Sequence, residues 1–379
     1  MFINTYGMKR FVVIFLLMLL QMVGGIAQNA FCNKKGTFLL DEYNMCVLDR
    51  FYMNGKAGVC RWDYNKQAAV VLTFDDWTPG QFPLVVPTLK RFGMVATFFP
   101  IPNNILSSEL AWNAVKTTVN NGNEIGNHSW SHPDMTKLSA IKLQDEICKS
   151  KNLVEDNVPK EKSISFAYPY GTFNQQVVDS LRANGYVGAR GVWRISDYSY
   201  DFAKNENDYY NIRIYGMNEQ TKNSMYFSEV ENVIDGGGLL TFLYHSVDDD
   251  LNSYKDSWYA QVKLDSLREQ LRFLKKNEDK LWITTFGNAV LYHREANCVK
   301  TSVSEKKDRI IVNLTISDFD LLQLVPQNQL VPLSVVLYTE RKIKRIVQNG
   351  VTIPIEAQTC CWVRFRAVPN GGEVTVECE

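Results

Sequence analysis

The chain has 379 residues, of which 45% are hydrophobic, and its formal net charge at pH 7 is zero. No basic block is present, and nucleic-acid binding depends on clustered Lys and Arg that neutralise phosphates, so a nucleic-acid partner is not expected. A chain of this size can bury a large core, and its length indicates one large domain with a smaller one.

The first segment has the pattern of an export signal. Lys9 and Arg10 precede an apolar stretch over residues 11–22, and the small residues Gly25 and Ala27 suit the −3 and −1 positions of a cleavage site. The apolar stretch is shorter than the roughly 20 residues that span a bilayer. We therefore expect residues 1–27 to be a signal peptide and the mature protein to be secreted or periplasmic, without stable membrane insertion. An uncleaved N-terminal anchor is the alternative.

Residues 28–65 are expected to form an N-terminal extension that contains cysteines. The chain has eight cysteines and no CxxC pair, which argues against a thiolate zinc site. In an oxidising compartment disulfides are expected. Three cysteines precede residue 66 and four follow residue 297, so we expect local bridges at each end, with a connectivity that the sequence does not fix.

Residues 66–294 alternate short β-rich runs with amphipathic segments. This alternation predicts parallel strands joined by crossover helices, and its length favours a barrel over an open sheet. Residues 194–212 interrupt the pattern, and we interpret them as a long loop over the functional site, with an ordinary surface excursion as the alternative. The expected strands cover 68–74, 94–99, 164–168, 186–189, 239–244 and 281–286, and the expected helices cover 105–120, 136–155, 174–184 and 256–277.

Residues 295–379 have a different pattern. Polar and apolar residues alternate between turn signals such as Asn349-Gly350, and helical periodicity is absent. We expect a small all-β sandwich that binds glycan or supports the barrel. Trp362 is either an aromatic platform for a sugar or a core residue. The expected strands cover 309–317, 330–338, 343–353, 361–367 and 373–378.

Candidate functional residues lie at the ends of the expected barrel strands. The pair Asp75 and Asp76 ends one run, His245 ends another, and His128 and His132 follow a further short run with i, i+4 spacing. Active sites of barrel and α/β folds gather at such strand ends. Two imidazoles and one carboxylate suit Zn²⁺ or a similar divalent ion, and the second carboxylate and third histidine then remain for proton transfer. Taken singly, each pair also fits a surface or loop-capping role.

Four motifs in this order resemble those of the polysaccharide deacetylases, carbohydrate esterase family 4. They are Thr-Phe-Asp-Asp at 73–76, His-x-x-x-His at 128–132, Phe-Ala-Tyr-Pro-Tyr-Gly at 166–171 and Leu-Tyr-His at 243–245. The resemblance covers about 66–294 and implies an α/β fold, a distorted (β/α) barrel, in agreement with the alternation. It also implies an enzyme that hydrolyses N-acetyl or O-acetyl groups on an acetylated polysaccharide or oligosaccharide.

The resemblance further implies a metal triad and its expected ion. Asp76, His128 and His132 match the family's metal ligands, and the expected ion is a divalent metal, Zn²⁺ first among them. Trp77 stands where the family commonly has Gly, so it is either a sugar-stacking residue or a plain wall residue. Trp193 is a second candidate for substrate binding.

The catalytic roles also follow from the resemblance. Asp75 matches the general base, His245 the general acid, and the Tyr170 backbone N–H the donor of the oxyanion site. The family often has an Arg where this chain has Ala167, and that Arg orients the base. We expect Arg190, at the end of the run 186–189, to take its place, with a surface arginine as the alternative.

Two polar residues have no firm role. Asp197 is a weak match for the aspartate that supports the acid histidine in the family. His293 is expected to be a polar residue just beyond the last helix of the barrel. Two other functions remain open: a non-catalytic sugar-binding relative and another metal-dependent hydrolase, such as a phosphoesterase. The latter usually needs more carboxylates for a second metal, or an Arg/Lys clamp.

Overall fold

The computed structural model describes residues 57–159, 163–249 and 259–379. The expected signal peptide (1–27) and most of the expected extension (28–65) lie outside these ranges. No helix within the described ranges is long and apolar enough to cross a membrane. Across the same ranges no disulfide joins the cysteines, so the expected local bridges are not found there.

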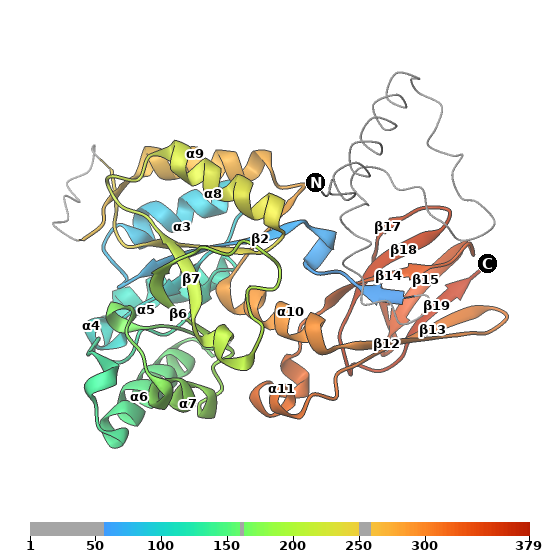
Figure 1. Ribbon diagram of the computed structural model, residues 1–379, viewed down its shortest axis with the longest axis horizontal. Helices are drawn as coiled ribbons and strands as arrows, with labels where there is room; N and C mark the ends of the chain where they lie inside the picture. Colours follow the sequence, from blue (N-terminus) through green and yellow to red (C-terminus); the bar gives the residue numbers. More distant parts are fainter. Residues whose placement is uncertain (1–56, 160–162, 250–258) are drawn as a thin grey trace, which may run out of the picture. The chain divides into compact units, whose positions relative to one another are not determined.

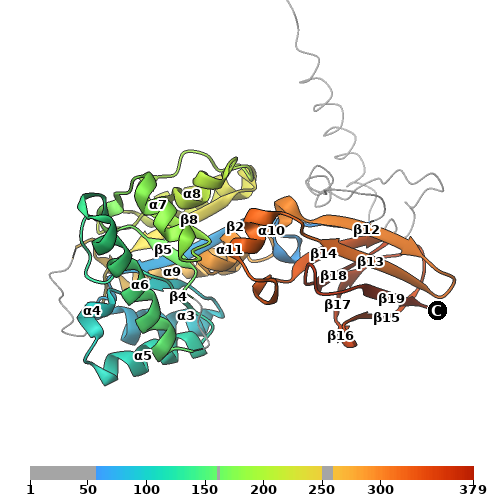
Figure 2. The same cartoon turned by 90° about the horizontal axis from the view of Figure 1, so that it is seen from below.

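A curled sheet of eight parallel strands forms the centre of the larger part of the molecule (Figures 1 and 2). Its order is β4-β3-β2-β8-β7-β6-β5, and β11 pairs with the first half of β2. Asn127, just after β4, bridges to β5, because its N–H donates to Ser165 and its carbonyl accepts from Ala167. The expected distorted (β/α) barrel is therefore confirmed. The strands are β2 (Ala68–Asp75), β3 (Thr97–Phe99), β4 (Glu124–Ile125), β5 (Ser165–Ala167), β6 (Gly188–Arg194), β7 (Ile212–Gly216), β8 (Leu239–Tyr244) and β11 (Leu281–Thr284).

Helices cover the outer faces of this sheet, and local signals set their ends. Ser108, Ser139 and Asn174 each accept a hydrogen bond from a backbone N–H of the first helical turn. Gly93 and Gly237 end two helices in the left-handed conformation that glycine adopts without strain. The helices are α3 (Val86–Phe92), α4 (Pro102–Ile105), α5 (Glu109–Asn120), α6 (Ala140–Asn157), α7 (Gln175–Ala183), α8 (Asn223–Gly236), α9 (Leu264–Lys276) and α10 (Phe286–Cys298).

Several elements of the barrel do not correspond to expected ones, among them β4, β7, α3, α8 and α10. Strand β4 has only two residues, too few for a detectable alternation. Helix α8 does carry a signal, since buried Tyr226, Val230 and Val233 are spaced four and three residues apart.

The expectation that residues 194–212 form a loop over the site is wrong. After β6, the chain runs back toward the amino ends of the strands. There Tyr200 is buried, and the Tyr210 hydroxyl donates to the carbonyl of Tyr186, two residues before β6 begins. The tyrosine rings of this segment therefore belong to the core at the end of the barrel opposite to the expected site.

The C-terminal part is an all-β sandwich with one short helix, α11 (Phe319–Leu324), that the sequence did not indicate. One sheet has the order β1-β14-β18-β17 and the other β12-β13-β19-β15-β16, and all their pairs are antiparallel. Strand β1 precedes the barrel in sequence, within the expected extension. The strands are β1 (Ala57–Val59), β12 (Lys300–Glu305), β13 (Arg309–Thr315), β14 (Leu333–Tyr338), β15 (Ile343–Gln348), β16 (Val351–Ile353), β17 (Ile355–Gln358), β18 (Trp362–Ala367) and β19 (Val374–Cys378).

His293 lies inside helix α10 and not beyond the last helix, so that expectation is wrong. The side chain is fully buried among aromatic rings, including those of Trp62 and Phe202. Its Nδ1 lies 2.9 Å from the Tyr209 hydroxyl, and its Nε2 lies 3.0 Å from the carbonyl oxygen of Tyr200. The helix continues to Cys298 because its last turns pack inside this aromatic cluster instead of facing solvent.

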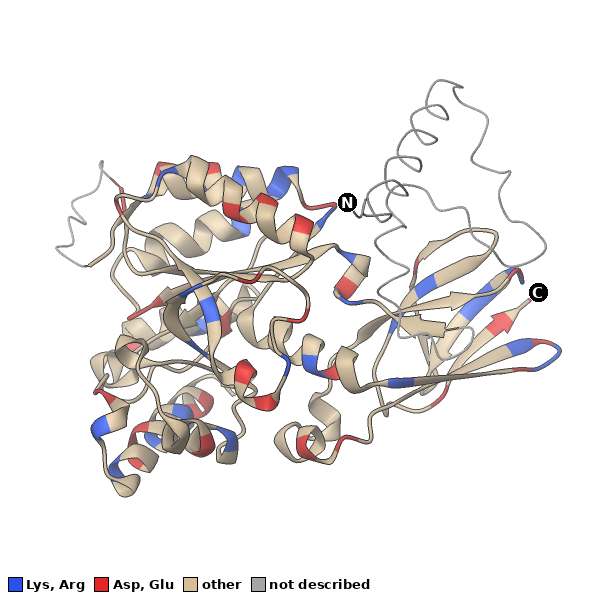
Figure 3. Ribbon diagram, in the orientation of Figure 1, with Lys and Arg blue, Asp and Glu red and all other residues tan. Residues whose placement is uncertain are grey.

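Charged residues of both signs are interspersed along the outer helices (Figure 3). Helix α9 has an exposed ion pair between Arg268 and Asp265, and α6 has one between Lys149 and Asp145. Exposed pairs of this kind contribute little to the free energy of unfolding. These faces are solvated surface.

Candidate active site

Three side chains converge at the carboxyl ends of the barrel strands. Asp76 directly follows β2, and His128 and His132 lie in the loop after β4. The Nε2 atoms of His128 and His132 lie 3.5 Å and 3.9 Å from Asp76 Oδ1. One ligand atom from each of the three residues lies within 4.8 Å of the others. These distances allow the three side chains to share one ion.

The loop that carries the two histidines is fixed by its own polar groups. Asn127 is fully buried, and its Oδ1 accepts hydrogen bonds from the Ser129 N–H and the Ser150 hydroxyl. The Ser129 hydroxyl in turn accepts from the His132 N–H at 3.0 Å. Because Asn127 is buried in these contacts, the segment 127–129 is a structural turn and not an accessible glycosylation sequon.

The ring of His128 is oriented by a backbone carbonyl. Its Nδ1 lies 2.7 Å from the oxygen of Ala167, so Nδ1 carries the proton and Nε2 faces Asp76. A second hydrogen bond of this kind is usual for metal-bound histidines. Burial lowers the pKa of His128 to about 4, so the ring is neutral near pH 7 and offers a lone pair.

One carboxylate oxygen of Asp76 is a buried acceptor without a hydrogen-bonding partner. Its Oδ1 contacts no donor within the described residues. Burial, followed by the charge of neighbouring Asp75, raises the pKa of Asp76 to about 6. An orphaned carboxylate oxygen beside two imidazoles whose pKa values are lowered by burial suits a cation, because a buried charge without a partner is costly. The donor set therefore fits a divalent ion, and two nitrogens with one carboxylate suit Zn²⁺.

Asp75 is held by Arg190. One guanidinium nitrogen of Arg190 donates to Asp75 Oδ1, and both side chains are buried. Arg190 on β6 pairs directly with Ala167 on β5. It therefore lies beside the position from which an arginine would orient Asp75 if one stood in place of Ala167. Burial alone would raise the pKa of Asp75, but the nearby Arg190, His128 and His245 outweigh it and hold the pKa below its ordinary value. Asp75 is therefore an ionised carboxylate beside the three-residue cluster.

His245 completes the ring of side chains around Asp76. It follows β8 directly, and its Nε2 lies 4.0 Å from Asp76 Oδ2. Its ring meets that of Tyr259 edge-to-face at 5.4 Å. Asp197 is not near it, because Asp197 lines a hollow together with Leu239, at the other end of β8. The suggested support of His245 by Asp197 is wrong, because the chain directly after β6 turns away from the site.

Tyr170 lies in a tight turn beside the cluster. Its ring meets the ring of His132 at 4.6 Å, and the side chain is 63% exposed. The turn packs closely on β6: a Cβ at Gly171 would lie 2.4 Å from the Val192 side chain, and Gly171 has a positive φ. Trp193, the next residue along β6 after Val192, is 58% exposed. Tyr170 and Trp193 thus present aromatic surface to solvent at this end of the barrel.

Trp77 has a different environment. Its side chain is partly buried and meets the ring of Phe98 edge-to-face at 5.7 Å. The indole packs on the core beneath the site, which matches the wall-residue alternative more closely than a free stacking platform.

Backbone conformation marks the same region. Among the described residues ten non-glycine residues have a positive φ, and five of them belong to this site. Such conformations cost about 1–3 kcal/mol each and persist where the surroundings impose them, commonly at active sites. The five residues are Asp76, Trp77, Ser129, His132 and Tyr170.

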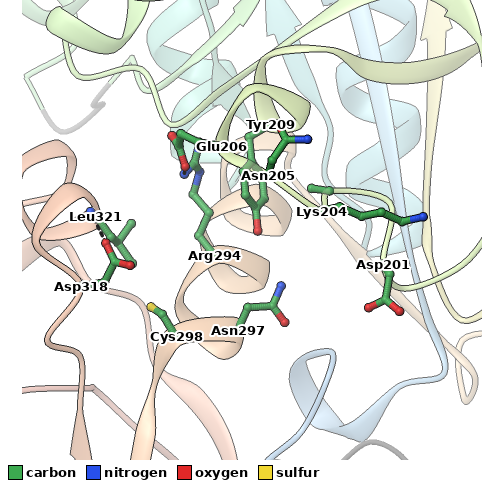
Figure 4. A pocket seen from close by; sticks show the side chains of 11 residues that line it. Asp201, Lys204, Asn205, Glu206, Tyr209, Arg294, Asn297, Cys298, Asp318 and Leu321 are labelled. Carbon is green, nitrogen blue, oxygen red and sulfur yellow. Dashed lines mark hydrogen bonds and ion pairs between the residues drawn. The ribbon is translucent and has the colours of Figure 1, made fainter.

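A hollow lies elsewhere and contains none of these residues. It has a volume of about 540 Å³ and lies beside the last turn of α10 (Figure 4). Arg294, Asn297 and Cys298 from α10 line it together with Glu206 and Asp318, and Arg294 forms an ion pair with Glu206 at 2.6 Å. The convergence of Asp76, His128 and His132 instead favours the strand ends as the candidate site.

Comparison with known proteins agrees with the motif resemblance. The polysaccharide deacetylase family model matches residues 63–189, so the match includes Asp75, Asp76, His128 and His132 and ends before Arg190 and His245. The resemblance to this family is confirmed.

Individual relatives match over shorter shares of their length. A peptidoglycan-N-acetylglucosamine deacetylase of Bacillus cereus is 38% identical over 92 residues, which are 24% of this chain and 32% of that protein. A peptidoglycan-N-acetylmuramic acid deacetylase of Bacillus subtilis is 30% identical over 149 residues, 39% of this chain and 50% of that protein. The chain thus spans half or less of the length of these two relatives.

A solved structure supports the fold. A protein of Mycobacterium smegmatis assigned to the polysaccharide deacetylases superposes with a TM-score of 0.50 at 14% identity, over 66% of this chain and 98% of that one. At this identity the likeness concerns the barrel fold and not the reaction.

Proposed function

We propose that this protein is an exported, metal-dependent deacetylase that hydrolyses N-acetyl or O-acetyl groups on a glycan. One observation carries the proposal. A cluster of one carboxylate and two neutral imidazoles has Asp75, an ionised carboxylate held by buried Arg190, on one side and His245 on the other. Hydrolysis of an acetyl group needs a base, an acid and an electrophile at one place, and this arrangement supplies residues for each.

Asp76, His128 and His132 would hold the ion. The chemistry that a divalent ion supplies when bound is polarisation of the acetyl carbonyl and a lower pKa of water. The His128–Ala167 hydrogen bond orients one ligand in advance, and the Ser129–His132 bond holds the loop of the other.

Asp75 acts as the general base and takes a proton from the attacking water. Arg190 keeps this carboxylate ionised and turns it toward the cluster, as does the family arginine that Ala167 replaces. His245 protonates the leaving amine or alkoxide from the other side of Asp76. The Tyr170 backbone N–H donates to the oxygen that becomes negative in the transition state. Removing one donor of this kind typically lowers kcat by about 10²–10³.

The exposed rings of Trp193 and Tyr170 provide a surface for pyranose faces. The relatives act on peptidoglycan, which makes peptidoglycan the first glycan to test.

The alternatives fit less well. A non-catalytic sugar-binding relative would not need Arg190 buried against Asp75, with the acid and the three ligand residues all beside it. A two-metal phosphoesterase needs further ligands, and the described residues contain one such group of three.

The proposed domains are a signal peptide at 1–27, a Cys-containing extension at 28–65, the deacetylase barrel at 66–294 and the sandwich at 295–379. Contacts join the sandwich to the rest of the chain: the Ser334 N–H donates to the Tyr292 hydroxyl of the barrel, and the Ser334 hydroxyl donates to Asp63 of the extension. These contacts favour the supporting role for the sandwich.

The experiment is acetate release from a panel of acetylated glycans, with and without chelator. Peptidoglycan, chitin oligosaccharides and acetylated xylan separate amide from ester substrates. We expect release that chelator abolishes and added Zn²⁺ restores. Release that persists after complete removal of metal would contradict the proposal, as would the absence of release from every substrate by the metal-loaded protein.

A further inference from the structure

The loop between β2 and α3 lies against the carboxyl end of β8. Thr78 donates its hydroxyl to the carbonyl oxygen of His245 at 3.1 Å. A Cβ at Gly80 would lie 2.0 Å from the carbonyl oxygen of Val247, so only glycine allows this approach. The loop is thus tied to the residue that follows β8, at the point where the proposed acid lies.

Gln81 makes the central contact of this loop. Its side chain is fully buried, and Nε2 donates to the carbonyl oxygens of Asp75 at 2.5 Å and His245 at 2.9 Å. Carbonyl oxygens only accept, so the NH₂ group of the amide must face them. Gln81 therefore links the backbone of the proposed base to the backbone of the proposed acid.

The link begins where the strand pairing ends. Strands β2 and β8 pair in register up to Phe74 and Tyr244, one residue before Asp75 and His245. Beyond that pair no β2–β8 ladder contact remains to fix the spacing of the two strand ends. The side-chain amide of Gln81 joins the next pair of residues, Asp75 and His245, which the strand pairing no longer joins.

We propose that Gln81 is a positioning residue that sets the separation between Asp75 and His245. The inference rests on the proposed function, because the two residues need a fixed geometry only if they transfer protons to and from one substrate. Misplacing a catalytic group by about 1 Å can lower the rate by about 10²-fold. Asp75 has Arg190 as a second anchor, so loss of Gln81 displaces His245 more than Asp75.

The test is Gln81→Met, which keeps the length of the side chain and removes both hydrogen bonds. We expect kcat for an N-acetylated glycan to fall about tenfold, with KM and zinc content within about twofold of wild type. With 4-nitrophenyl acetate the decrease should be smaller, because a good leaving group needs little protonation by His245.

Gln270→Met is the matched control. Gln270 is also fully buried, and its amide pairs with the Tyr244 hydroxyl and with Asn223, but it contacts neither catalytic backbone. We expect this variant to lower the melting temperature about as much as Gln81→Met and to leave kcat for both substrates unchanged.

Thr78→Val serves if Gln81→Met does not fold, because it removes one of the two side-chain donors to the His245 carbonyl. We expect kcat to be about two- to threefold lower for the amide substrate and unchanged for the aryl ester. This magnitude corresponds to the loss of one hydrogen bond of modest net strength. The inference is overturned if folded Gln81→Met or Thr78→Val keeps the wild-type kcat for the amide substrate. It is also overturned if kcat falls by the same factor for the amide and for the aryl ester. Inactivity of the wild-type protein would instead overturn the proposed function.

Discussion

Two fully buried histidines, His128 and His293, lie at opposite ends of the barrel and differ in what their ring nitrogens contact. Burial lowers the pKa of both, to about 4 for His128 and about 3 for His293, so both are neutral near pH 7. Both nitrogens of His293 have partners in the fold, Tyr209 and Tyr200. In His128 one nitrogen has Ala167, and the other faces Asp76, whose Oδ1 has no donor.

The difference separates a histidine that is fully paired within the fold from one whose Nε2 is placed to bind a ligand. Burial and a shifted pKa are common to both, so neither property identifies the site. The distinguishing property is an unsatisfied group, because buried polar groups in a stable core are normally paired. The orphaned oxygen of Asp76 beside His128 fits a bound cation, whereas both ring nitrogens of His293 already have partners in the fold.

The largest expected effect comes from removing the orphaned carboxylate. Asp76→Ala should lose bound zinc and reduce acetate release to background, because two neutral imidazoles alone hold a catalytic ion weakly. Zinc content after gel filtration and acetate release measure both outcomes. An Asp76→Ala variant that kept stoichiometric zinc would mean that Asp76 is not a ligand.

Asp75→Asn should have the next largest effect. The amide cannot accept a proton as the carboxylate does, so kcat should fall by about 10²–10⁴. Zinc content should stay at the wild-type level, since Asp75 lies beside the cluster and is not part of it. Near-normal turnover of Asp75→Asn would show that the base lies elsewhere.

Arg190→Lys should lower kcat about 10- to 100-fold, with zinc content unchanged. The estimate follows from the loss of a charge-assisted hydrogen bond, about 1.5–3 kcal/mol. Lysine keeps the charge but not the planar fork of donors. Steady-state kinetics with metal analysis tests the assignment, and Arg294→Lys, at a buried arginine beside the aromatic cluster, is the matched control. Equal losses in the two variants would remove the special role of Arg190.

The smallest effect on catalysis is expected at the opposite end of the barrel. His293→Phe should leave kcat unchanged and lower the free energy of unfolding by about 1–3 kcal/mol, because the Tyr209 hydroxyl loses a buried partner. Urea unfolding and acetate release measure the two quantities. A large loss of kcat in a stable variant would end the distinction between the two histidines.

The same variant tests the pH dependence. The pKa of His293 is lowered by burial to about 3 in the fold, from an ordinary value of about 6.5. Its contribution to stability is therefore complete above about pH 6.5 and is lost as the pH falls toward 3. We expect the difference in melting temperature between wild type and His293→Phe to shrink over this interval. A difference that stays constant from pH 7 to pH 4 would contradict the buried, neutral state.

The sequence predicted those elements best whose signal lies in a short run of neighbouring residues. The β-rich runs between amphipathic segments predicted most barrel strands. The predicted ends of the apolar strands β2 and β8 differ from the observed ends by at most one residue. Two-residue β4 carried no such signal. The tyrosines of 194–212 suggested a loop over the site, but periodicity does not tell which end of a barrel a returning chain covers.

The motifs by themselves determined the identities of Asp75, Asp76, His128, His132 and His245, because their order and spacing are properties of the chain. The tertiary structure decided which neighbours complete them. Arg190 reaches Asp75 because register places it beside Ala167, and Gln81 joins Asp75 to His245 because its loop lies against the end of β8. Contacts of this kind depend on strand register and loop path, which join residues far apart in sequence and leave no periodic trace in it.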